Sequence, residues 1–105
     1  LLHDLNFALN NTPFKVAYRV QNELVLYFYS LREEKLEESA EDLLKLAFDA
    51  ILMMKVLPRI EGDEDLLKEP LKDLEEFTQY YPDSHKKIEE MIARLDRVHF
   101  TSFWP

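Results

Sequence analysis

A single arginine, Arg19, lies within an otherwise largely apolar and aromatic stretch, FKVAYRVQNEL, at residues 14–24. The apolar residues after it recur at helical spacing, which puts Arg19 near the beginning of a helix. A cation there opposes the helix dipole, whose amino end is already positive. Arg19 therefore either points to water, with Glu23 one turn later as an exposed partner worth a few tenths of a kcal/mol, or meets an anion supplied from elsewhere.

Other residue types that do chemistry in proteins are present, but they form no recognisable motif. The histidines His3, His85 and His99 are scattered, and no two of them have the i, i+4 spacing of metal ligands on a helix. Carboxylate pairs such as Glu33 and Glu34 are common in so acidic a chain, and one glycine is too few for a phosphate-binding loop. We predict no catalytic residue and no metal site here, and no catalysis by this chain alone.

Composition narrows the classes of partner. A net charge of −8 argues against direct binding of nucleic acid, because phosphate contacts need clustered Lys and Arg. No apolar run approaches the ~20 residues of a membrane span, and the absence of cysteine fits a cytoplasmic protein. Acidic residues gather in segments 33–42 and 61–76. They predict a solvated face, and a docking surface for a basic partner is the alternative.

The elements that must position Arg19 are predicted to be helices. The 105 residues fit one domain, and 47% of them are apolar. A segment with Leu1, Leu2, Leu5 and Leu9 at helical spacing ends near Pro13. The next helix starts either at Thr12–Pro13 or nearer Ala17. Its inward stripe is Val20, Leu24, Phe28 and Leu31, with Tyr27 beside it.

Three further helices follow in the pattern. Ser39 and Asp42 resemble a capping box that opens a helix to about Leu57, the most buried one, which Pro58 stops or kinks. Gly62 indicates a loop. A helix at 69–80 has Pro70 in its first turn, and Asp83 or Ser84 caps a last helix with the stripe Ile88, Met91, Ile92 and Leu95. The sequence thus predicts an all-α bundle of four to five helices, residues 1–105, ending in a short extended aromatic tail that docks on something.

Three segments, in this order, resemble a known family. They are AYRVQNEL at 17–24, MMKVLPRIEGDE at 53–64, and YYPDSHKKIEEMIARLDRVHFTSFW at 80–104. Together they are similar to the carboxyl-terminal part of McrB-type AAA+ NTPases, the motor subunits of modified-cytosine restriction systems and their relatives. The resemblance spans nearly the whole chain. It departs from the family pattern at His99, where glycine is expected before Phe100, and over residues 32–50, where only the apolar pattern agrees.

The resemblance implies a fold and a role. In AAA+ proteins the region after the nucleotide-binding core is a helical lid, and an arginine near the start of a lid helix approaches the γ-phosphate. Arg19 matches that position and would be the nucleotide-sensing residue, with phosphate as the missing anion. Arginine suits this role because it is always charged and offers a planar fork to phosphate oxygens.

The same resemblance sets the expected partners. The chain begins at Leu1 inside an apolar pattern, so we expect a fragment, the lid of a longer NTP hydrolase that binds ATP or GTP with Mg. The fragment alone is expected to bind no cofactor. Expected partners are the AAA+ core of the same chain, neighbouring subunits of a ring, and a nuclease subunit. The alternative is an independent acidic helical adaptor that binds a basic protein partner.

Overall fold

The computed structural model describes residues 18–35 and 37–104, and of Tyr18 and Arg19 it describes the backbone alone. The predictions for Leu1–Leu9 and for a helix start at Thr12–Pro13 lie outside these residues. In the described part, four α-helices and a two-stranded sheet form a small helical bundle, so the predicted all-α class is confirmed. The elements are α2 (Tyr18–Glu34), α3 (Ala40–Ile51), β1 (Glu61–Asp63), α4 (Glu64–Phe77), α5 (Pro82–Val98) and β2 (Phe100–Ser102).

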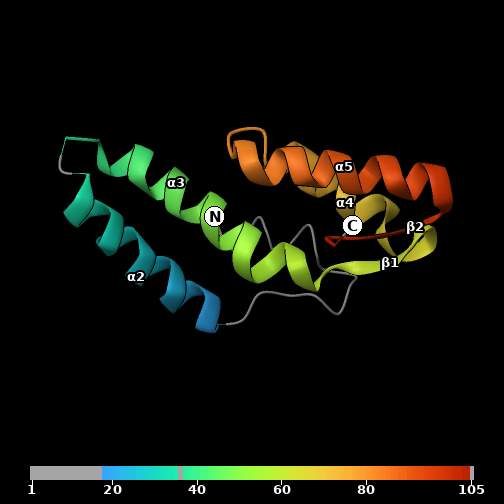
Figure 1. Ribbon diagram of the computed structural model, residues 1–105, viewed down its shortest axis with the longest axis horizontal. Helices are drawn as coiled ribbons and strands as arrows, with labels where there is room; N and C mark the ends of the chain where they lie inside the picture. Colours follow the sequence, from blue (N-terminus) through green and yellow to red (C-terminus); the bar gives the residue numbers. More distant parts are fainter. Residues whose placement is uncertain (1–17, 36, 105) are drawn as a thin grey trace.

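The bundle consists of two helical hairpins joined through α3 (Figure 1). Helices α2 and α3 lie side by side in one hairpin, and α4 and α5 in the other. The backbone after α3 stays helical, as a π-helix at Leu52–Val56 and a 3₁₀-helix at Leu57–Arg59, and leads into β1. Strand β1 pairs antiparallel with β2, with Gly62 opposite Thr101.

The core is built from apolar residues of both hairpins, and of the two predicted stripes Phe28, Leu31 and Ile92 are only partly buried. Leu43, Ala47 and Phe48 of α3 are almost fully buried, and so are the inward residues of the second hairpin, which are Leu67, Leu71, Leu74, Ile88, Met91 and Leu95. Burying each large apolar side chain contributes about 1.5–3 kcal/mol. The ring of Phe48 lies 5.9 Å from Phe77 and 5.1 Å from Tyr81 between centroids, which joins the two hairpins.

The start of α4 and the conformation at Gly62 differ from the prediction. The α-helix expected to begin at residue 69 begins at Glu64, because the Asp63 side chain accepts a hydrogen bond from the Leu66 N–H at 3.0 Å. Pro70 therefore lies inside α4 and is buried, not in the first turn. Gly62 lies in strand β1 and not in a loop. A Cβ there would come within 2.8 Å of Leu66 Cδ2, which favours glycine.

The predicted cap of α3 at Ser39 is confirmed, since Ser39 Oγ accepts from the Asp42 N–H at 3.2 Å. The α-helix itself ends at Ile51 and not near Leu57, because the backbone changes to the wider π form well before Pro58. A π-helical turn within a helix is often associated with functional sites.

The predicted cap of α5 is wrong. The N-cap residue is Tyr81, with no side-chain hydrogen bond, and Pro82 begins the helix. The cap comes instead from Asp49 of α3, a residue that is only 5% exposed. Asp49 accepts from the N–H of Asp83 at 3.0 Å and from that of Ser84 at 2.8 Å, and its backbone carbonyl accepts from Ser84 Oγ at 3.2 Å. An anion there also suits the dipole of α5.

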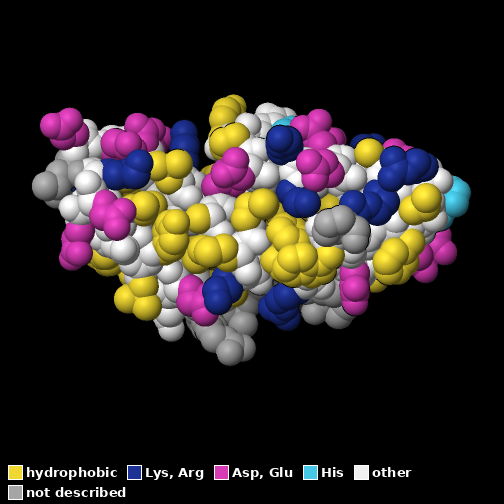
Figure 2. Space-filling model, in the orientation of Figure 1, with side chains coloured by type: hydrophobic (Ala, Val, Ile, Leu, Met, Phe, Trp, Pro, Cys, Tyr) yellow, Lys and Arg dark blue, Asp and Glu magenta, His cyan; other side chains and the backbone are white. Residues whose placement is uncertain are grey.

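Charge is unevenly distributed over the surface. Figure 2 shows acidic side chains at the end of the molecule that carries the α2–α3 connection, and a group of basic side chains over α5. The exposed acids of segment 33–42, which are Glu33, Glu34, Glu37, Glu38, Glu41 and Asp42, lie at that first end. The acids of segment 61–76 lie on β1 and α4, so exposed acidic side chains occur on both hairpins.

Candidate functional site

The backbone of Arg19 lies in the first turn of α2, so its predicted place near the beginning of a helix is confirmed. Its side chain is outside the described residues. The helix is held there by Val20 and Leu24, which are 7% and 6% exposed and belong to the common core. The beginning of α2 is thus fixed to the bundle by residues that follow Arg19.

The first turn of α2 differs from the other α-helices that the structure describes. It contains no acidic residue, whereas α3, α4 and α5 each begin with Asp or Glu in the first turn. Those acids stabilise the positive end of their helices. A cation in the corresponding turn of α2 adds to the positive end, so this is a local environment that an anion would stabilise.

Glu23, which was one of two alternative partners for Arg19 in the sequence, pairs with Lys55 in the described part of the structure. The Lys55 Nζ lies 3.8 Å from Glu23 Oε2, and the Glu23 side chain is 31% exposed. That oxygen is buried and accepts no hydrogen bond among the described residues. Lys55 belongs to the π-helix, so the pair ties this segment to α2. Sequence reasoning missed the pair because the two residues are distant in the chain.

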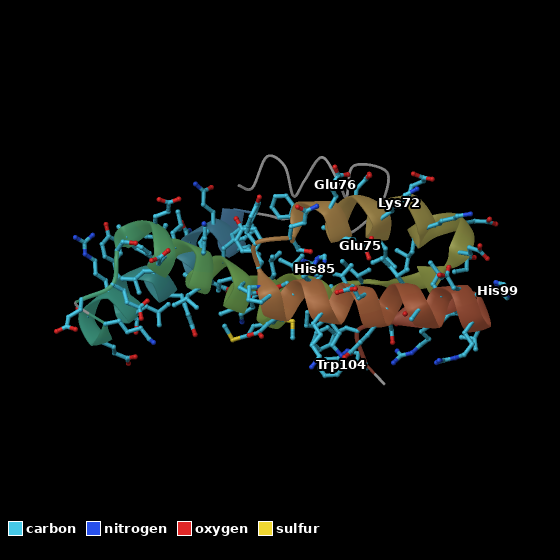
Figure 3. The ribbon with its side chains drawn as sticks, turned by 90° about the horizontal axis from the view of Figure 1, so that it is seen from above. Lys72, Glu75, Glu76, His85, His99 and Trp104 are labelled. Atoms are coloured by element: carbon cyan, nitrogen blue, oxygen red, sulfur yellow. The ribbon has the colours of Figure 1, made fainter. Side chains whose placement is uncertain are left out.

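His85 and His99 are not brought together, and His3 lies outside the described residues. Figure 3 shows His85 on α5 near the end of α4, and His99 at the opposite end of α5. His99 ends α5 in the left-handed region, at φ 63°, and its Nδ1 lies 2.8 Å from Glu64 Oε2. Within residues 18–35 and 37–104, no three His, Cys, Asp or Glu side chains are grouped to hold a metal ion.

His85 links the end of α4 to α5. The Thr78 hydroxyl donates to the Leu74 carbonyl at 2.7 Å and lies 3.2 Å from His85 Nδ1. On the other side of the ring, Nε2 lies 3.3 Å from Glu89 Oε1. Although this order of groups resembles a nucleophile, base and acid, the Thr78 side chain is completely buried. No substrate can reach it, so the chain of contacts is structural.

The aromatic tail lies along α5, on the side away from α4 (Figure 3). Arg94 Nη1 donates to the carbonyls of Ser102 at 3.1 Å and Trp104 at 2.7 Å. Lys87 donates to the Phe103 carbonyl at 3.3 Å and lies 4.8 Å from the centroid of the Phe103 ring. Two basic residues of α5 thus hold the carbonyls of the tail.

Comparison with known proteins identifies a family and no function. The chain belongs to the family described as a domain of unknown function, DUF8727, whose model matches residues 1–100. Searches of curated proteins and of solved structures each gave no match. Among the described residues, no helix has the length and apolar character needed to cross a membrane.

Proposed function

We propose that this chain is the helical lid subdomain of an AAA+ NTPase motor of the McrB type. In this proposal Arg19 contacts a nucleotide phosphate that is bound by the AAA+ core of the same chain. The observation that carries the proposal is the first turn of α2, which has Arg19 and no acidic residue. The ordered segments at 17–24, 53–64 and 80–104 support it.

The conformation of His99 is consistent with the resemblance. The family pattern has glycine at this position, and the backbone here is left-handed, at φ 63°, where glycine is most at ease. The departure at His99 therefore does not require a different backbone. The pair with Glu64 accompanies the histidine in this chain.

The role proposed for Arg19 is recognition of charge. Its guanidinium would offer two parallel N–H donors to phosphate oxygens, and the phosphate would offset the unfavourable position of the cation in the helix dipole. Because the contact requires the phosphate, the position of the lid would depend on the nucleotide state. The chain would catalyse nothing alone.

The wider proposal concerns the parent protein. It would bind ATP or GTP with Mg through the core, work in the cytoplasm, and form a ring in which the lid contacts neighbouring subunits. A nuclease subunit would be a further partner, as the resemblance to restriction systems implies. The sequence encoded ahead of Leu1 provides a direct test, since the proposal requires a glycine-rich phosphate loop and an acidic strand there.

The mutational test uses the full-length protein. Arg19→Ala should reduce NTP hydrolysis by about tenfold or more, equivalent to about 1.4 kcal/mol of transition-state stabilisation. The matched control is Arg32→Ala, which removes an exposed arginine from the last turn of the same helix and should leave turnover unchanged. Circular dichroism would establish that both variants fold. Equal turnover in the Arg19 variant and the wild type would remove Arg19 from the mechanism.

A further inference from the structure

A groove with a volume of about 320 Å³ lies between α3 and the turn that joins α4 to α5. Figure 2 shows the surface hollowed between these elements. Apolar surface from Leu46 and Pro82 and the ring of Tyr80 line part of it, and Glu38 and Asp42 contribute carboxylates. The volume lies near the lower end of the range for ligand pockets, so the groove suits one long side chain.

The apolar and aromatic groups of the groove are unusually exposed. Tyr80 is 70% exposed and Leu46 is 44% exposed, so both present apolar surface that the bundle itself does not cover. Asp49 also borders the groove, but its carboxylate is already engaged by two backbone N–H groups of α5. The carboxylates available to a ligand are therefore those of Glu38 and Asp42.

These two carboxylates differ in their partners. Glu38 lies 3.8 Å from Lys35 Nζ, and both side chains are more than 40% exposed, which makes a weak ion pair. In the part of the chain that the structure describes, the Asp42 carboxylate forms no ion pair. Asp42 is thus the stronger candidate to receive a cation from outside.

The chain already places a cation of its own in this groove. Lys45 Nζ lies 5.7 Å from the centroid of the Tyr80 ring, within the range of a cation–π contact, and 3.9 Å from Glu41 Oε1. The Lys45 side chain is 46% exposed, so it is held loosely and can be displaced. Its ammonium group marks a position beside Tyr80 that a cation already occupies.

We propose that this groove binds an arginine or lysine side chain from a basic segment of another protein. The aliphatic stem would pack on Leu46 and Pro82, and the charged head would meet Asp42 and the face of Tyr80. Arginine fits best because its planar head both stacks on rings and pairs with carboxylates. The six exposed acids of segment 33–42 would attract such a segment over a longer range.

The occupant is a protein segment and not a nucleic acid, since the acidic surroundings repel phosphate. This inference goes beyond the proposed lid function and does not depend on it. The groove is formed by the end of the α2–α3 connection, by α3 and by the α4–α5 turn with Pro82, and none of its lining residues belongs to α2. The test of Arg19 and the test below can therefore succeed or fail separately.

The first experiment is an NMR titration of the ¹⁵N-labelled 105-residue chain with a peptide of alternating glycine and arginine. The control peptide carries citrulline, a neutral side chain of nearly the same shape, in place of arginine. The arginine peptide should shift the amides of Leu46 and Tyr80, and the citrulline peptide should not. Shifts confined to other regions, or equal shifts with both peptides, would overturn the proposal.

The second experiment distinguishes binding in the groove from non-specific attraction of a basic peptide to an acidic protein. Asp42→Asn should weaken binding of the arginine peptide by about threefold, and Tyr80→Ala by about as much. The matched control Asp73→Asn removes the same charge from the exposed face of α4 and should have no effect. Equal losses in the two Asp variants would mean non-specific attraction and would refute the proposal.

Replacing Lys45 should change the affinity for the arginine peptide in the opposite direction. Lys45→Gln removes the competing cation and should strengthen binding by about threefold. Lys72→Gln, on the outer face of α4 in Figure 3, changes the net charge equally and should not. Identical affinities in the two Lys variants would contradict the assigned position of the cation.

Discussion

Replacing Asp49 by alanine removes the buried carboxylate that joins α3 to the beginning of α5. Two backbone N–H groups, at Asp83 and Ser84, lose their acceptor, and that of Ser84 is buried. Leaving a buried donor unpaired costs about 1–3 kcal/mol, and losing a helix cap costs about 0.5–2 kcal/mol. We expect a loss of about 3 kcal/mol in the free energy of unfolding.

Asp49→Asn separates the charge from the shape of the side chain. Its amide oxygen can still accept from one N–H, while its NH₂ group faces the other, so we expect an intermediate loss of about 1.5–2 kcal/mol. As a control, Asp63→Ala removes an exposed cap that accepts one local N–H from Leu66. That loss should be about 1 kcal/mol.

Urea unfolding of the three variants and the wild type, followed by circular dichroism at 222 nm, would measure these differences. A loss of 3 kcal/mol is a large fraction of the roughly 5–15 kcal/mol that stabilises a typical domain. The midpoint should fall without a large change in slope. If Asp49→Ala costs no more than Asp63→Ala, then Asp49 does not act as a buried cap between helices, and the reasoning is wrong.

Two further predictions concern the end of α5. His99→Gly should be more stable than His99→Ala by about 1 kcal/mol in urea unfolding, because glycine relieves the left-handed backbone and both variants lose the contact with Glu64; equal midpoints would contradict this. Arg94→Ala should free the tail and make the fluorescence of Trp104, the single tryptophan, more readily quenched by acrylamide, whereas Arg97→Ala should not. Unchanged quenching in the Arg94 variant would show that other contacts hold the tail.

Much of the fold could be predicted from local patterns. The stripes Val20–Leu24 and Ile88–Met91–Leu95 recur at helical spacing, and they are buried because a helix turns such residues to one side. The Ser39 cap could be predicted because its partner is three residues away. The start of α4 differs from the prediction, because Pro70 resembles a first-turn proline whereas the cap is Asp63, seven residues earlier.

Less of the candidate site than of the fold could be predicted from the sequence. The sequence led to Arg19 through its type and its place in an apolar pattern, and its backbone lies in the first turn of α2. The pair of Glu23 with Lys55 was not predicted, because it depends on how the π-helix packs against α2. The groove was missed for the same reason, since Leu46 and Tyr80 lie on different elements.

By itself, then, the sequence determined that the chain is helical, which side of α2 and of α5 is buried, and that acidic residues gather in two segments. These properties follow from periodicity and composition within a few turns of chain. Tertiary structure alone decided that Asp49 caps α5, that Lys55 meets Glu23, and that Tyr80 borders an acidic groove. Each of these depends on packing between residues far apart in the chain, which no local spacing specifies.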